Sequence, residues 1–218
     1  MRCSELSLAL GEELIGTAPQ VTHWQLVEHP GPWGREAVKD LGIVAEDGAK
    51  ALLIRRALPD GRAFLVCTNG RRDECCSLRG LPVARALGEQ AVECTHLGGH
   101  RFAANVLVLP ENLLFGRLDA AGALAVADSL ASGELPLEHL RGRCTLTPEQ
   151  QAAEILLRRE LGLHGLEDVR HLEGTAFTGR TGGVVSVRVH GEQLPPRRVS
   201  CGDVKEEAPI RWHLVSIS

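Results

Sequence analysis

Apolar and polar positions in the first third of the chain predict a series of short strands. Residues 21–28 alternate apolar and polar side chains, which is typical of a strand, and a second strand is predicted over 51–56. A short helix near 33–39 is expected between them, after a Pro-Gly-Pro break. The Pro-Asp-Gly turn at 59–61 leads into an apolar strand that ends at Cys67. The end of this strand is a suitable position for a ligand.

A longer helix is predicted after Asp73, whose side chain can cap its first turn, and Gly88 is expected to end it. Pro82 should kink this helix. Four apolar positions are spaced for one buried face, namely Leu78, Leu81, Ala84 and Leu87.

The following residues predict a strand, a hairpin and another helix. The strand covers 91–95, and the hairpin joins 102–109 to 113–118 through a turn at 110–112. An alanine-rich helix is predicted over 120–131.

Beyond Pro136 the pattern changes. Thr147, a following proline and Gln150 form a capping box that opens a helix, which is expected to end at Gly162. Residues 167–218 are glycine-rich and contain short β-type runs, which predict a small antiparallel addition. The mixture of elements indicates an α/β (α+β) fold.

Composition narrows the class of protein. A chain of 218 residues with 44% hydrophobic content can bury a substantial core. Its 24 basic and 28 acidic side chains are spread evenly, so neither nucleic acid nor a membrane is an expected partner. The absence of a long apolar stretch and of an export signal at the start favours the cytoplasm. No feature indicates an oligomeric state.

The cysteines suggest metal or redox chemistry. Seven cysteines without an export signal argue against a disulfide framework. Cys67 and Cys76 are separated by eight residues, and His96 and His100 by three, of which two are glycines that let the backbone turn. Two thiolates and two imidazoles suit either a tetrahedral zinc ion or a [2Fe-2S] cluster of the Rieske ligand type. The wide cysteine spacing favours the larger cluster.

Several motifs resemble the sucrase/ferredoxin-like family. The main ones are CTNGRRDECCSLRGLPVARAL from Cys67 and THLGGHRFAANVLVLPENLLFGRL from Thr95, supported by RCS at 2–4, GTAP at 16–19, EHPGPWG at 28–34 and RGRC at 141–144. The resemblance implies a thioredoxin-like ferredoxin core over 62–138. It also implies an N-terminal β/α extension over 1–61 and a C-terminal helix and β addition over 139–218.

The resemblance implies that Cys67, Cys76, His96 and His100 hold a [2Fe-2S] cluster. We expect the two cysteines to bind one iron and the two histidines the other. The family further implies electron transfer with a redox partner protein, a reductase or an acceptor, so that the chain is an electron carrier rather than an enzyme in its own right. One departure, TNG where many relatives have a histidine before the glycine, should alter the polarity around Cys67.

The other cysteines, and the arginines near the ligands, have ordinary structural roles as alternatives to a role in the site. Cys75 is a substitute for Cys76, Cys94 is expected in the core, and ordinary burial is the default for three cysteines without visible partners, Cys3, Cys144 and Cys201. Three arginines near the ligands could raise the potential or dock an acidic partner, or could simply be solvated or paired with Asp73 or Glu74: Arg71, Arg72 and Arg101.

Three function classes compete with the electron carrier. A zinc-stabilised binding module uses the same four ligands, whereas a thioredoxin-like thiol oxidoreductase lacks its C-x-x-C motif here. A glycosidase, which the family name suggests, needs two facing carboxylates, and no segment shows that pair.

Overall fold

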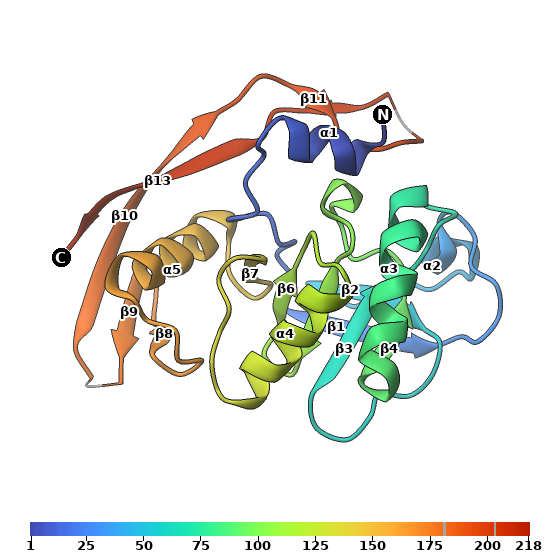
Figure 1. The fold of residues 1–218 in the computed structure, drawn as a ribbon, viewed down its shortest axis with the longest axis horizontal. Helices are drawn as coiled ribbons and strands as arrows, with labels where there is room; N and C mark the ends of the chain where they lie inside the picture. Colours follow the sequence, from blue (N-terminus) through green and yellow to red (C-terminus); the bar gives the residue numbers. More distant parts are fainter. Residues whose placement is uncertain (181, 203) are drawn as a thin grey trace.

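A mixed sheet forms the centre of the protein, as a computed structural model that describes residues 1–180, 182–202 and 204–218 shows (Figure 1). Its seven strands lie in the order β1-β2-β4-β3-β5-β6-β7. The pairs β1/β2 and β3/β4 are parallel, and the other pairs are antiparallel. The strands are β1 (His23–Glu28), β2 (Ala49–Ile54), β3 (Ala63–Cys67), β4 (Ala91–Cys94), β5 (Val106–Leu109), β6 (Leu113–Phe115) and β7 (Leu140–Arg143).

The helices are α1 (Cys3–Ala9), α2 (Ala37–Asp40), α3 (Glu74–Leu87), α4 (Ala120–Ala131) and α5 (Pro148–Leu161), with 3₁₀ turns η1 (Gly88–Gln90) and η2 (His100–Phe102). The predicted caps of the longest helices are confirmed. Asp73 accepts a hydrogen bond from the Cys75 amide at the start of α3, and Thr147 caps α5 together with Gln150. None of the helices in the described part of the chain has the length and apolar character needed to cross a bilayer.

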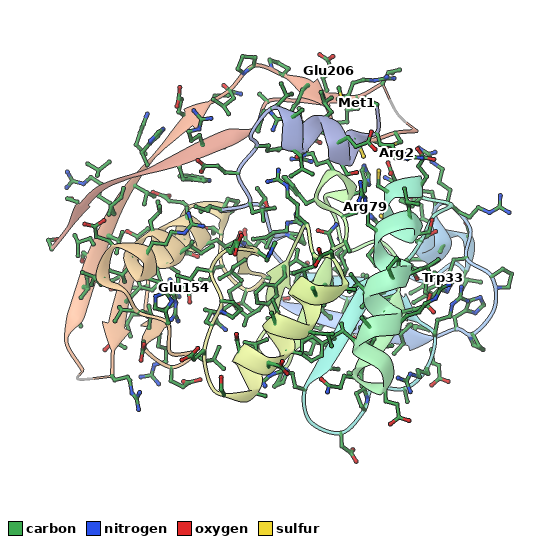
Figure 2. All side chains as sticks on the ribbon, in the orientation of Figure 1. Met1, Arg2, Trp33, Arg79, Glu154 and Glu206 are labelled. Carbon is green, nitrogen blue, oxygen red and sulfur yellow. The ribbon has the colours of Figure 1, made fainter. Side chains whose placement is uncertain are left out.

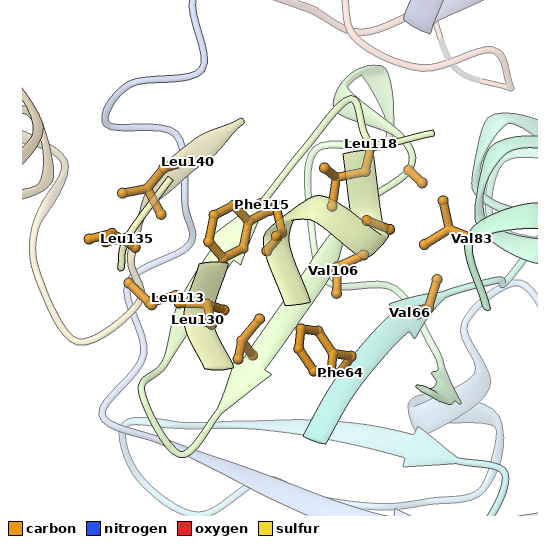
Figure 3. Packing of buried hydrophobic residues seen from close by; sticks show 14 of the residues in the cluster. Phe64, Val66, Val83, Val106, Leu113, Phe115, Leu118, Leu130, Leu135 and Leu140 are labelled. Carbon is orange, nitrogen blue, oxygen red and sulfur yellow. The ribbon is translucent and has the colours of Figure 1, made fainter. Parts of the chain in front are cut away.

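Two apolar cores lie on opposite faces of the sheet. Phe64 and Val66 of β3 pack with Val83 of α3 and with the apolar side of α4 (Figure 3). The alternate positions, Leu65 and Cys67, face a second core on the other side of the sheet. Because β3 is buried on both faces, its last residue Cys67 is held between the two layers.

The C-terminal residues form the antiparallel addition that the sequence predicts. Its four strands, in the order β13-β10-β9-β8, pack against α5, and a two-stranded ribbon joins β11 to β12. These strands are β8 (Val169–His171), β9 (Ala176–Gly179), β10 (Val184–Gln193), β11 (Arg197–Arg198), β12 (Glu206–Glu207) and β13 (Ile210–Ile217). The elements confirm a mixed α+β fold. The domain boundaries after residues 61 and 138 and the thioredoxin-like character of the core stay predictions.

The buried face of α3 differs from the predicted one. Leu87 is buried as predicted, but Leu78 is 49% exposed, and the residues that α3 buries are Cys75, Cys76, Gly80, Val83 and Leu87. Gly80 explains the difference, because a Cβ there would lie 2.3 Å from the carbonyl oxygen of Cys67. The helix therefore turns Gly80, rather than Leu78, toward β3, and this close approach brings Cys76 next to Cys67.

Replacing Gly80 with alanine is expected to push α3 away from β3 and to lower the free energy of unfolding by about 1–3 kcal/mol. Chemical denaturation measures this change. The matched control is Gly122→Ala in α4, where the nearest atom to the new Cβ is the side-chain oxygen of Asp119 at 3.3 Å. The control should change stability by less than about 1 kcal/mol. Equal stability of the two variants would contradict the close-approach argument.

Candidate metal centre

The four predicted ligands come from three adjacent places in the fold. Cys67 ends β3, and Cys76 lies in the first turn of α3, the helix that follows β3. His96 and His100 lie on the loop after β4. This strand is the parallel neighbour of β3, and its last residue, Cys94, pairs with Cys67. Since parallel strands end at the same edge of a sheet, this topology brings the two ligand-bearing loops together.

Three of the four side chains meet directly. The Nδ1 atom of His96 lies 4.0 Å from Cys67 Sγ and 3.9 Å from Cys76 Sγ, and all three donor atoms lie within 4.8 Å of one another. Both cysteines are buried, whereas His96 is partly exposed. Borderline ions such as zinc and the irons of iron–sulfur clusters prefer this donor set.

His100 lies beside this group without joining it. Its ring stacks on that of His96, with 4.8 Å between the ring centroids. Its Nδ1 atom is buried and finds no hydrogen-bond partner among the described residues, and its Nε2 atom lies 3.8 Å from Asp73 Oδ2. A buried polar atom without a partner is costly, and a metal ion would satisfy it. The carboxylate near the other nitrogen fits the usual support of a metal-binding histidine.

The pKa values of the two cysteines shift in opposite directions. The neighbouring Cys76 and His96 and the backbone amide of Leu97 hold the pKa of Cys67 well below its usual range. The neighbouring Cys67, together with burial, holds the pKa of Cys76 well above its usual range. Because metals bind cysteine as the thiolate, a metal bound by both sulfurs would displace the proton of Cys76.

Hydrogen bonds fix the histidine loop in place. The three carbonyl oxygens of residues 97–99 each accept a side-chain hydrogen bond, in turn from the ammonium of Lys50 at 2.9 Å, the guanidinium of Arg141 at 2.9 Å and the side-chain amide of Asn105 at 2.9 Å. Because these carbonyls are bound to donors in the surrounding structure, the loop is fixed where His96 meets the cysteines and His100 lies beside them.

Arg141 is the central support of this loop, a role that the sequence pattern does not indicate. It is buried, it also donates to Asn105 Oδ1 at 2.7 Å and to Thr17, and its guanidinium lies 4.8 Å from the centre of the Phe102 ring. Burial lowers its pKa to about 9. Gly99 has φ +68°, and a Cβ there would lie 2.6 Å from the guanidinium. Arg141 of the RGRC motif and Gly99, the second glycine of the loop, therefore pack directly against each other.

The arginines that flank the ligands are held in ion pairs or lie on the surface. Arg101 pairs with the buried Glu12 at 2.9 Å, Arg72 pairs with Glu36, and Arg71 is exposed. The expected partners, Asp73 and Glu74, are not the ones that Arg72 and Arg101 use. Glu12 is a buried carboxylate whose pKa stays low because Arg101 and Arg197 neutralise it against the effect of burial.

The remaining cysteines fall into two groups. Cys94 is buried in the core, as expected, and Cys144 lies in the same core. Cys75 faces away from Cys67, because its sulfur lies 3.6 Å from that of Cys3 and 3.5 Å from that of Cys201. It is therefore no substitute for Cys76. The expectation that Cys3 and Cys201 lack partners was wrong, since their partners lie far away in the sequence.

Burial lowers the pKa of His100 to about 4, from an ordinary value of 6.5, so its ring is neutral and able to bind a metal at pH 7. In the unfolded chain this ring takes up a proton near pH 6.5. As the pH falls from 7 to 4, the unfolded state binds more protons than the folded state. The metal-free protein should therefore lose up to about 3 kcal/mol of stability through this group.

Urea denaturation of the metal-free protein over this pH range measures the loss. The variant His100→Gln should show a shallower dependence, with the remaining slope coming from carboxylates such as Glu12 and Asp73. Identical slopes for the two proteins would show that His100 does not contribute.

Comparison with known families identifies the region that carries the centre. The family described as sucrase/ferredoxin-like matches residues 49–142, a stretch that contains all four predicted ligands. Neither the curated proteins nor the solved structures contain a match to the chain. The motifs of Cys67 and His96 predicted this family, and the comparison supports the prediction: residues 49–142 of the chain match the sucrase/ferredoxin-like family model.

Proposed function

We propose that the chain is an electron carrier whose [2Fe-2S] cluster is bound by Cys67 and Cys76 on one iron and by His96 and His100 on the other. The observation that carries this proposal is the contact of two buried cysteines with His96, on which His100 stacks with a buried nitrogen that has no hydrogen-bond partner among the described residues. The family match over the same residues supports it. When bound, such a cluster takes up and releases single electrons.

The surroundings of the ligands suit this role. Cys67, Cys76 and His100 are at most 9% exposed, so water is kept from the donor atoms. His96 is the partly exposed ligand, and it lines a surface hollow with four basic side chains and one acidic side chain, namely Arg35, Lys39, Lys50, Arg72 and Glu36. We propose that electrons enter at the His96 edge, from a redox partner protein with an acidic docking surface, in the cytoplasm.

Neutral imidazoles in place of two thiolates should give a mid-range potential that depends on pH. The Nε2 atom of His100, 3.8 Å from Asp73, is a position where the protein can hold a proton. The midpoint is expected to fall as the pH rises, by at most about 59 mV per pH unit. A spectroelectrochemical titration between pH 6 and 9 measures this slope, and a flat midpoint would remove the proton-coupled part of the proposal.

Anaerobic purification of the full chain, followed by a visible spectrum and iron, sulfide and zinc analysis, tests the function. The proposal expects a brown-red protein with equal amounts of iron and acid-labile sulfide. A zinc-stabilised binding module is the second candidate, because Cys67, Cys76 and His96 are already close enough for one tetrahedral ion. A colourless protein with zinc at this site would favour it, and a metal-free protein with thiol turnover would favour an oxidoreductase.

A further inference from the structure

Three cysteines from distant parts of the chain, two of them buried and one partly exposed, meet at one point outside the candidate metal centre. The Sγ atoms of Cys3, Cys75 and Cys201 form a triangle with sides of 3.4, 3.5 and 3.6 Å. Between 72 and 198 residues separate each pair along the chain. Cys3 begins α1, Cys75 lies in the first turn of α3, and Cys201 follows the strand β11.

Asp73 completes this group. Its two carboxylate oxygens lie 3.7 and 3.8 Å from Cys3 Sγ, and the donor atoms of all four residues lie within 4.8 Å of one another. Its side chain is fully buried, and it accepts hydrogen bonds from the amides of Cys75 and Cys201 and from the Ser200 hydroxyl. Within the described residues, no arginine or lysine forms a salt bridge with this carboxylate.

The spacing of the sulfurs fits a tetrahedral ion. Zinc–thiolate bonds of about 2.3 Å at tetrahedral angles place neighbouring sulfurs about 3.8 Å apart. The observed triangle needs to widen by only a few tenths of an ångström. A disulfide would instead require two of the sulfurs to approach to about 2.0 Å. The Cys3 amide donates to the Cys201 sulfur at 3.2 Å and the Ser4 hydroxyl to the Cys75 sulfur at 3.3 Å, which are the contacts that coordinated thiolates commonly accept.

We propose that Cys3, Cys75, Cys201 and Asp73 form a second metal site, which binds a zinc ion independently of the site at Cys67. Three thiolates and one carboxylate supply four negative ligands in a buried place, and a divalent cation compensates a large part of that charge. Each thiol that coordinates passes its proton to the solvent. A surface hollow lined by Met1, Arg2, Cys3 and Cys201 gives the ion a route to the site.

The second site would fasten α1 and the residues after β11 to the core. Figure 1 shows α1 beside β11 at one edge of the molecule, next to the first turn of α3, and Figure 2 shows Met1 and Glu206 at this same edge. Cys75 and Cys76 are consecutive, so α3 supplies one sulfur to each site. Asp73 also approaches His100 of the first site. The two sites would therefore be neighbours that share α3, while each keeps its own set of ligands.

Metal analysis of the anaerobically purified full chain tests this proposal. The wild type should contain one zinc per chain in addition to the metal of the first site. Cys3→Ser and Cys201→Ser should lose this zinc and retain the first metal, whereas Cys67→Ser should lose the first metal and retain the zinc. Cys144→Ser is the matched control, because the buried Cys144 sulfur belongs to neither group of donor atoms and its loss should change neither metal.

Alkylation of the wild type provides a readout that does not depend on a variant. Iodoacetamide labelling followed by peptide mapping should show Cys3 and Cys201 protected in the zinc-loaded protein and modified at least several-fold faster after a chelator is added. Wild-type protein that contains no such zinc and gains no protection on addition of Zn²⁺ would overturn the proposal. A Cys3–Cys201 disulfide in the anaerobic protein, or equal zinc loss from the Cys144→Ser control, would overturn it as well.

Discussion

Replacing Cys76 with serine is expected to remove nearly all of the metal from the Cys67 site. A serine hydroxyl is a poor ligand for iron or zinc at neutral pH, because the thiolate is the form of the side chain that binds these metals. The neighbouring Cys75 cannot take over, since its sulfur is turned toward Cys3 and Cys201. Iron and zinc analysis and the visible spectrum of the purified variant measure the loss.

Cys94→Ser is the matched control for this variant. Cys94 is fully buried, pairs with Cys67 across the parallel strands and lies two residues before His96, yet its sulfur is not part of the donor group. The control should lose some stability and keep its metal. Retention of metal by Cys76→Ser, or its loss from Cys94→Ser alone, would contradict the assignment of Cys76 as the ligand.

The parts of this site that local sequence can encode were predicted correctly. The strand that ends at Cys67, the helix capped by Asp73 and the glycine loop after β4 all depend on contacts between residues near in sequence. The predicted face of α3 was right at Leu87 and wrong at Leu78, which the apolar spacing favoured but which is exposed. The decisive feature was the missing Cβ of Gly80 against β3, and that contact exists only after the strand and helix pack.

The supports of the site could not be predicted because they depend on distant contacts. Cys3 and Cys201 lie 198 residues apart, and nothing in the sequence near either of them indicates the other. Arginine usually lies at the protein surface, and only the fold shows that Arg141 is buried against Phe102. Sequence spacing can identify ligands on one or two loops, whereas residues that hold those loops come from the whole chain.

Replacing Arg141 with methionine is expected to lower the free energy of unfolding by about 3 kcal/mol. Methionine fills much of the same volume but provides no donor, so the acceptors at Thr17, Gly98 and Asn105 are left buried and unpaired. Each unpaired acceptor costs about 1–3 kcal/mol. Part of this cost is offset because the variant no longer buries a charged guanidinium. Chemical denaturation measures this change. Because the Gly98 carbonyl loses its donor, the histidine loop should also bind metal about 10- to 100-fold more weakly.

Arg141→Lys separates the charge from the geometry. A lysine keeps the cation but cannot donate to three acceptors in the planar arrangement of a guanidinium, nor stack in the same way on Phe102. It should therefore recover part of the stability and less of the metal affinity. If Arg141→Met bound metal as tightly as the wild type, the histidine loop would be held by Lys50 and Asn105 alone. Arg141 would then stabilise the fold without positioning the ligands.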